Sequence, residues 1–198
     1  MQTSIQLLDR LSALFNQSLR EDAARHGLLP IHLQALAYLS AANQYSDIPV
    51  AVAEYFGTTR GTVSQTLAVL VRKGLIQKEA DPKHGKRIHL RLTDAGQKVL
   101  TTSWAQRLGN VLEFKNTDTK NSDNKKSSNI EASLEALLVE LQKQNSNQAF
   151  GVCHRCAHFQ RNENDSQCGL TGESLATEQT VKICREWQDP TSDHGEAA

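Results

Sequence analysis

The stretch "GTVSQTLAVLVRKGLIQKEADPKHGKRIHLRLTDAG", residues 61–96, decides the fold of this chain. Apolar residues recur at steps of three and four up to Gly74, which is typical of a helix that ends at a glycine. Apolar and polar residues then alternate in "LIQKEA" and "RIHLRLT", residues 75–80 and 87–93, which is typical of strands. The segment between them, "DPKHGK", contains turn formers and cations. The stretch therefore predicts a helix followed by a two-stranded hairpin with a cationic tip.

Helical patterns flank this hairpin on both sides. They cover residues 5–20, 27–42, 47–57, 58–74, 93–115 and 130–143. Asp47 is a candidate cap for the third of these helices, and Thr93 for the fifth. In the second strand, the alternation puts Ile88, Leu90 and Leu92 on one face and His89 and Arg91 on the other. The pattern predicts a mainly α fold with a small β-wing, a winged helix-turn-helix.

Such a unit suits DNA binding. Its second helix enters the major groove and presents polar side chains near its N-terminus to base edges. Here that end is "TTRGTVSQT", residues 58–66, in which Arg60 has the shape to pair bidentately with guanine and Gln65 with adenine. Cations on the hairpin loop are expected to reach phosphates or a narrow minor groove. The predicted DNA-contacting residues are Thr59, Arg60, Thr62, Ser64, Gln65, Lys83, Lys86 and Arg87.

Residues 1 to about 145 resemble the MarR family of bacterial winged-helix transcription regulators. The resemblance is carried by "VAVAEYFGTTRGTVSQTLAVLVRKGLIQKEADPKHGKRIHLRLTDAGQKVL", residues 50–100. It implies a homodimer, built from the first helix and the last two, that sets two recognition helices into successive major grooves of a pseudo-palindromic operator. The family's wing often carries an acidic residue two positions before a basic one. This chain has His84 at that position, before Lys86.

The domain organisation follows from the polar stretches. Residues 1–145 are expected to form the DNA-binding and dimerisation domain. Residues 116–129 within it contain no apolar side chain, so we expect a flexible insert there. A small cysteine-rich module is expected over residues 149–190, and a disordered tail over residues 191–198.

Bulk composition adds three expectations. The chain of 198 residues has 22 basic and 22 acidic residues, but residues 60–91 carry eight basic and two acidic ones. This asymmetry favours nucleic acid at the middle of the chain. The sequence shows neither an apolar run long enough to cross a membrane nor the pattern of a signal peptide, so we expect a cytoplasmic protein. It also lacks a Ser/His/Asp set, an HExxH motif and a phosphate-binding loop, so we expect no enzyme.

The chain has four cysteines, and all lie near the C-terminus. Cys153, Cys156, Cys168 and Cys184 have the spacing C-x2-C-x11-C-x15-C. In the cytoplasm thiols stay reduced, which favours a metal site over disulfides. Four thiolates match either zinc or an iron–sulfur cluster. The four could also be unrelated reduced thiols.

The spacing favours an iron–sulfur cluster, preferably 4Fe–4S, over zinc. Zinc sites usually combine two close ligand pairs, and this chain has one. We expect apolar residues to cover such a cluster, namely Phe159, Leu170, Val181, Ile183 and Trp187. A CxxC pair followed by an aromatic residue, then two separated cysteines with an aromatic after the last, resembles the ligand order of high-potential iron–sulfur proteins. His154 and His158 are expected to lie beside the centre without binding it.

Three functions remain open at this stage. The first is a homodimeric DNA-binding regulator, a repressor, whose DNA binding responds to redox or iron status through the cysteine centre. The second has the same fold with structural zinc, and it senses a small-molecule effector. The third is an electron-transfer or accessory protein that docks through its winged helix. Colour after oxygen-free purification and salt-dependent binding to duplex DNA separate the three.

Overall fold

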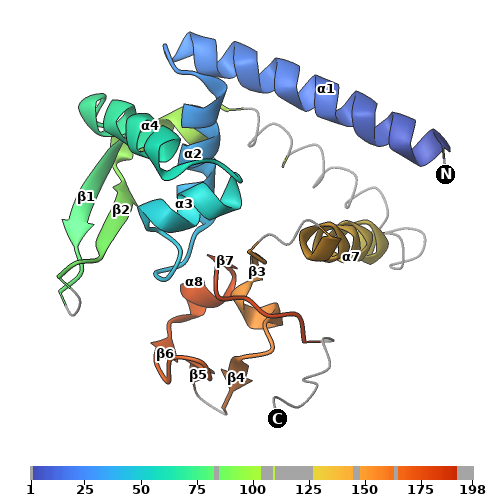
Figure 1. Ribbon diagram of the computed structural model, residues 1–198, viewed down its shortest axis with the longest axis vertical. Coiled ribbons are helices and arrows are strands. Elements are labelled where there is room, and N and C mark those ends of the chain that lie inside the picture. The colour runs from blue at the N-terminus through green and yellow to red at the C-terminus, as the bar shows by residue number, and fades with distance from the viewer. Residues whose placement is uncertain are drawn as a thin grey trace. The chain divides into compact units, whose positions relative to one another are not determined.

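The computed structural model describes residues 2–82, 85–103, 109, 127–144, 148–162 and 165–190 (Figure 1). The helices are α1 (Gln2–Arg25), α2 (Pro30–Ala41), α3 (Pro49–Tyr55), α4 (Arg60–Arg72), α5 (Asp94–Thr101), α7 (Ser127–Gln144) and α8 (Thr177–Thr180), with a 3-10 turn η2 (Cys153–Arg155). The strands are β1 (Ile76–Ala80), β2 (Ile88–Leu92), β3 (Gly151–Val152), β4 (Phe159–Arg161), β5 (Ser166–Cys168), β6 (Ser174–Leu175) and β7 (Ile183–Cys184).

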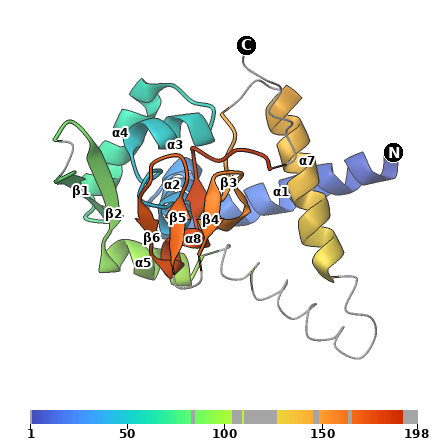
Figure 2. The same ribbon diagram turned by 90° about the horizontal axis from the view of Figure 1, so that it is seen from below.

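The predicted fold class is confirmed in its main lines. The chain is mainly helical, the strands β1 and β2 form a two-stranded wing, and a further β region follows at the C-terminal end. Figure 2 shows the wing strands side by side next to α4. The helix α7 also confirms the pattern seen over residues 130–143.

Two predicted boundaries differ from the structure. The helix expected over residues 93–115 is shorter, because α5 ends with Thr102 as its C-cap. Residues 104–108 and 110–115 of that prediction lie outside the described residues, as do residues 116–126 of the expected insert and the expected tail of residues 191–198. Since α7 begins at Ser127, the last three residues of the expected insert are helical.

The chain forms two compact units, each built from several separate segments. One unit contains α1, α2, most of α4, the ends of the wing strands nearest α4 and α5, and α5 itself. The other contains the loop of residues 42–48, α3, the start of α4, the outer part of the wing, α7 and the whole cysteine-rich region. The winged-helix segment therefore contributes to both units.

The first unit is built on a leucine core. Leu33 and Leu36 of α2 and Leu67 and Leu70 of α4 are fully buried. Burying a leucine side chain contributes about 2 kcal/mol, so these four residues account for much of the stability of this unit. The predicted cap of α5 is confirmed: Thr93 Oγ1 accepts a hydrogen bond from Gly96 N at 3.1 Å.

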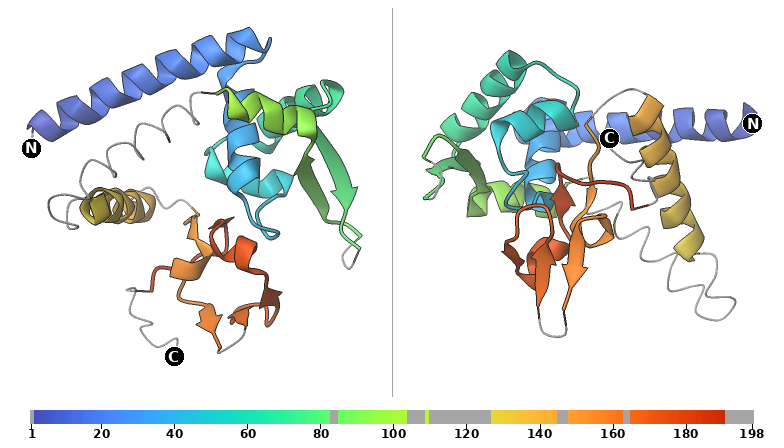
Figure 3. Two further views of the ribbon diagram at one scale, coloured as in Figure 1. Left: turned by 180° about the vertical axis from the view of Figure 1, so that it is seen from behind. Right: turned by 60° about the horizontal axis from the view of Figure 1, so that its bottom comes forward.

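The cysteine-rich region consists of short strands around a small core. The strands β3 and β7 pair antiparallel, and β4, β5 and β6 form a three-stranded sheet (Figure 3). Its core contains Cys153, Leu175, Cys184 and Trp187. A Cβ atom added to Gly151 would lie 2.5 Å from the Trp187 ring, so the indole packs directly on this glycine backbone. Glycine at this position is required by that close approach.

Among the described residues, the helices are all too short or too polar to span a lipid bilayer.

Candidate nucleic-acid interface and cysteine centre

The start of α4 is built by the turn that precedes it. The helix α3 ends at Tyr55, and Gly57 has a φ of 59°, which lets the chain turn sharply. Thr58 N then donates to Ala53 O at 3.0 Å. Thr59 Oγ1 accepts a hydrogen bond from Thr62 N at 3.2 Å, so Thr59 acts as a cap of α4 as well as a candidate DNA contact.

The predicted base-reading residues lie on the exposed side of α4. Exposed side chains are those of Thr59, Arg60, Thr62, Ser64 and Gln65. The helix packs through Val63, Thr66, Leu67 and Leu70, which are at most 6% exposed. Val71, next to Leu70 in the helix, is 38% exposed. Polar groups near the N-terminus of α4 are therefore available to a ligand, while its apolar side is occupied by the core.

The wing presents two of its three predicted cations. Lys86 and Arg87 are exposed, and Lys83 lies outside the described residues, as does His84. The base of the turn is closed by a hydrogen bond from Asp81 N to Arg87 O at 2.9 Å. Arg87 Nη1 also lies 4.0 Å from Asp81 Oδ2. Asp81 thus sits beside a cation of the wing, which the sequence did not predict.

His89 is buried, although the alternation of β2 places it on the same strand face as the exposed Arg91. Its side chain lies between two carboxylates: Nδ1 is 2.5 Å from Asp47 Oδ1, and Nε2 is 3.2 Å from Asp81 Oδ2. An ionised carboxylate accepts hydrogen bonds only, so both ring nitrogens must donate for both contacts to form. Together, Asp47, His89 and Asp81 link the loop of residues 42–48 to the wing.

Asp47 is accordingly not the cap of α3. The N-cap is Ile48, which makes no side-chain cap hydrogen bond, and Pro49 opens the helix instead. The Asp47 carboxylate is directed to His89, and its backbone carbonyl accepts from Leu90 N at 2.7 Å. A histidine with a buried carboxylate at long sequence separation leaves no local pattern from which to predict it.

Replacing His89 with glutamine is expected to lower the free energy of unfolding by about 2–3 kcal/mol, because the shorter reach of one amide group cannot bridge the Asp47 and Asp81 carboxylates as the imidazole ring does. Urea denaturation followed by circular dichroism measures the change. The matched control is Arg91→Gln, an exposed position on the same strand, which should change stability by less than about 0.5 kcal/mol. Equal effects of the two substitutions would contradict the structural role of His89.

The four cysteines are brought together by the pairing of the short strands. The turn η2 carries Cys153 and leads to Cys156, whose N–H donates to Cys153 O at 3.1 Å. In the sheet, Cys168 pairs with Phe159, and Cys184 of β7 pairs with Gly151 of β3. All four thiols are free. They line one enclosed space of about 20 Å³.

Buried hydrogen-bond donors lie beside this space. His158 lines it, and its Nε2 atom is buried without a hydrogen-bond partner among the described residues. The Asn43 Nδ2 atom is also buried, and the Asn43 side chain acts as a donor toward the Cys184 thiol. Gln188 N donates to Cys156 Sγ at 3.4 Å. Buried donors without acceptors are costly, so a centre that brings further acceptor atoms would relieve this cost.

Burial raises the pKa of two of the four thiols, Cys153 and Cys184. Burial and the neighbouring Cys184, Cys168 and Cys156 thiols raise the pKa of Cys153 to about 12. Burial likewise raises the pKa of Cys184, although the Asn43 side chain and the Glu186 backbone N–H act in the opposite direction. The thiolate is the metal ligand, so a cation bound here would displace protons and supply the charge that the site lacks.

The four thiols do not form a ready site for a single ion. In the described part of the chain, no group of three or more His, Cys, Asp or Glu residues is arranged to hold one metal ion. A tetrahedral zinc site requires four sulfur atoms about 2.3 Å from one centre. The donor set of four thiols with adjacent N–H groups nevertheless has the chemistry of a thiolate-bound centre.

Two apolar residues expected to cover the centre do not do so. Leu170 is 51% exposed and Val181 is 64% exposed. Phe159 and Trp187 do pack around the cysteines, and Tyr45 and Leu175 join them. Tyr45 belongs to the loop of residues 42–48, far from the cysteines in the sequence, so spacing alone could not identify it.

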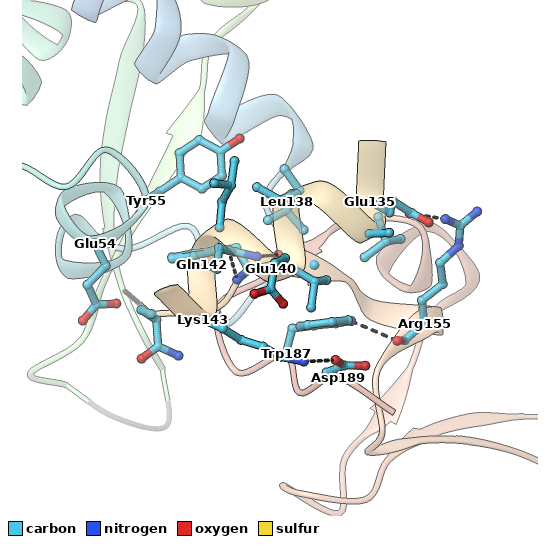
Figure 4. A pocket seen from close by; sticks show the side chains of 18 of the residues that line it. Glu54, Tyr55, Glu135, Leu138, Glu140, Gln142, Lys143, Arg155, Trp187 and Asp189 are labelled. Carbon is cyan, nitrogen blue, oxygen red and sulfur yellow. Dashed lines mark hydrogen bonds and ion pairs between the residues drawn. The ribbon is translucent and has the colours of Figure 1, made fainter. Parts of the chain in front are cut away.

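A second and larger cavity of about 1000 Å³ lies between the end of α3, α7 and the cysteine-rich region. Figure 4 shows Tyr55, Leu138 and Trp187 around it. Charged side chains at its rim are paired: Lys143 Nζ is 2.8 Å from Asp189 Oδ2, and Arg155 contacts Glu135. The sequence did not predict this cavity, because its walls come from three separate segments.

Comparison with known proteins supports the winged-helix assignment. Residues 26–87 match the profile described as "MarR family". S. aureus MepR in its DNA-binding conformation is 23% identical, with a TM-score of 0.56 over 70% of this chain and 98% of that one. The MepR–DNA complex is 24% identical, with a TM-score of 0.51 over 69% and 94% of the two chains.

A MarR-family regulator from Silicibacter pomeroyi is 21% identical, with a TM-score of 0.51 over 70% and 89% of the two chains. The search of curated proteins gave no match. The structural similarity to these proteins shows a common fold. The family profile covers the helix-turn-helix and the first wing strand with the turn that follows it. Residues 26–87 therefore resemble the MarR family in sequence, and the solved structures show the winged helix-turn-helix fold.

Proposed function

We propose that this protein is a transcriptional regulator that binds double-stranded DNA through α4 and the wing. The observation that carries the proposal is the exposed polar start of α4, above a core that fixes the helix. In this proposal Arg60 reads guanine, and Lys86 and Arg87 contact phosphate or the minor groove; the exposure of all three side chains supports these roles. The MarR family comprises transcription regulators and not enzymes, which agrees with this reading.

We further propose a homodimer on a pseudo-palindromic operator. Large apolar side chains are exposed on one side of α1, among them Ile5, Leu8, Leu11 and Phe15. The same holds on α7 for Leu134, Leu138 and Leu141. Contiguous exposed apolar surface marks an interaction site, and a second copy of the chain supplies an identical apolar surface to cover it.

For the cysteine module, the proposal is a thiolate-bound iron–sulfur cluster that makes DNA binding respond to redox or iron status. Cys153, Cys156, Cys168 and Cys184 would hold it, and such a centre supplies electron transfer and lability to oxidants. Two features support it: a shared enclosed space and adjacent buried donors. Structural zinc is the alternative.

A small-molecule effector is a second candidate input, favoured by the cavity between α3 and α7. Its volume of about 1000 Å³ is of the size that accommodates a drug-like ligand. The paired charges at its rim favour a largely apolar molecule. A compound that changes DNA affinity equally in metal-free and metal-loaded protein would act through this cavity and not through the cysteines.

DNA binding is tested by selecting duplexes from a random-sequence library and measuring affinity by fluorescence anisotropy at several salt concentrations. Affinity should fall steeply with salt, since phosphate contacts release counterions. Lys86→Gln should reduce the slope of log K against log salt by about 1, with little change in sequence preference. Lys78→Gln, an exposed lysine of β1 that we do not assign to the interface, is the matched control. No binding to any duplex at low salt would refute the proposal.

A further inference from the structure

The strand β7, which carries Cys184, pairs with the loop that precedes α3. Asn43 N donates to Ile183 O at 2.9 Å, and Ala42 and Ile183 form a parallel β-bridge. Nearby, Gln44 N donates to Gln179 Oε1 at 3.0 Å. Two backbone N–H groups of this loop are thus satisfied by the cysteine-rich region. The loop of residues 42–48 has its conformation fixed by the module and not by its own sequence alone.

Arg185, the residue after Cys184, makes the strongest of these contacts. Its guanidinium donates two parallel hydrogen bonds to the Glu54 carboxylate, from Nε to Oε2 at 2.9 Å and from Nη2 to Oε1 at 3.0 Å. Its backbone N–H donates to Ser46 Oγ at 2.9 Å. The two side chains are 22% and 28% exposed, so the pair is only partly screened by water. One residue therefore holds both the loop and α3.

A second contact runs from the same loop back to the cysteines. Tyr45 packs against the cluster that contains Cys153 and Cys184. Its hydroxyl donates to Glu173 Oε2 at 2.7 Å. The cysteine centre and the loop thus share one packed core, and a change in the position of the sulfur atoms reaches the loop through Tyr45 as well as through β7.

The loop in turn reaches both parts of the DNA-binding surface. Asp47 contacts His89, which contacts Asp81 beside the wing cation Arg87. Glu54 lies in α3, five residues before Thr59 at the start of α4. Thr59, Arg60, Thr62, Lys86 and Arg87 belong to the same compact unit as the four cysteines.

We propose that Arg185 is the positioning residue that couples the state of the four-cysteine centre to DNA affinity. This inference rests on the proposed function. When the centre is filled, Cys184 is held in place, and Arg185 fixes Glu54 and Ser46. When the centre is lost, Cys184 no longer fixes β7, and the hydrogen bonds between Arg185 and Glu54 break. The helix-turn-helix and the wing are then no longer held in one arrangement. The regulatory input thus acts on the DNA-binding unit directly.

The test uses the full-length chain reconstituted with iron and sulfide without oxygen, compared with the same protein stripped by chelator. The probe is the tightest duplex selected by the filled wild-type protein. Filled wild type is expected to bind this duplex roughly ten-fold more tightly than stripped protein, a typical allosteric coupling. Glu54→Gln should reduce the ratio to about two-fold or less while leaving iron and sulfide content unchanged, because Glu54 lies outside the cysteine-rich module.

Arg185→Gln should do the same, and Arg185→Lys, which keeps the charge without the two-pronged geometry, should fall between. The double variant of Glu54 and Arg185 should add nothing to either single one, since both remove the same contact. Arg161→Gln, an exposed arginine of β4 in the same module, is the control and should keep the wild-type ratio.

Hydrogen exchange gives a readout that does not depend on DNA. Stripping the wild type should raise exchange of the amides of residues 42–48, and the Glu54→Gln protein should already exchange faster there when filled. Three results would each overturn the coupling. They are a wild-type ratio of filled to stripped DNA affinity near one, an unchanged ratio in Glu54→Gln, and amide exchange at residues 42–48 that is the same with and without the metal. A chain that holds no metal, or binds no duplex, would refute the proposed function first and remove the basis of this inference.

Discussion

Replacing Cys184 with serine is expected to abolish stable incorporation of the metal centre and to unfold the cysteine-rich module. Cys184 is 6% exposed and lies in the core with Cys153 and Trp187. Residues 149–190 contain few apolar side chains, and five short strands of two or three residues around so small a core are not expected to fold without the metal. In modules of this kind the binding free energy of the metal supplies the free energy of folding, on the order of 10 kcal/mol for structural zinc.

Iron and sulfide analysis after oxygen-free reconstitution measures the loss, and Trp187 fluorescence reports unfolding. The matched control is Val181→Ser, which places serine at an exposed position three residues earlier. This control should keep wild-type iron content. Full retention of iron and sulfide in the Cys184→Ser protein would show that Cys184 is not a ligand.

The same experiment separates iron–sulfur from zinc. A cluster gives a brown protein with visible absorption and sulfide in about the same amount as iron, whereas zinc gives a colourless protein without sulfide. Since burial and the neighbouring thiols raise the pKa of Cys153 to about 12, metal binding must release protons. Affinity for either metal should therefore rise as the pH increases through the neutral range.

The winged-helix part of the fold was predictable because its signals are local. The apolar period of α4, the cap at Thr93 and the cationic turn between β1 and β2 each lie within a few residues of the element that they define. The identity of the exposed residues at the start of α4 followed from the same period. Family resemblance added the expected function and dimer but no further geometry.

The contacts that join the cysteine module to the helix-turn-helix were not predictable, because they join distant residues. Arg185 and Glu54 are 131 positions apart, and His89 and Asp47 are 42 apart. Neither pair has a sequence pattern that would bring its two residues together. The sequence of β2 does not show which segment packs on its polar face. In the structure the loop of residues 42–48 lies there and supplies the Asp47 carboxylate to His89.

Replacing Arg60 with alanine is expected to weaken binding to the selected duplex by about 1–3 kcal/mol, or roughly five-fold to 150-fold, and to relax preference at one base pair. Arg60 is the first residue of α4, and its side chain is exposed. Among the hydrogen bonds and ion pairs of the described residues, none involves this side chain. Folding stability should therefore remain within about 0.5 kcal/mol of wild type.

The loss at Arg60 should be specific to sequence, unlike the loss at Lys86. A phosphate contact lowers affinity for all duplexes and reduces the salt dependence, whereas a base contact lowers affinity for the selected duplex alone. Repeating the selection with the Arg60→Ala protein distinguishes the two. Arg20→Ala, an exposed arginine of α1, is the control and should leave both affinity and preference unchanged. An Arg60→Ala protein that binds selected and random duplexes with wild-type affinities would place the base-reading surface elsewhere than at the start of α4.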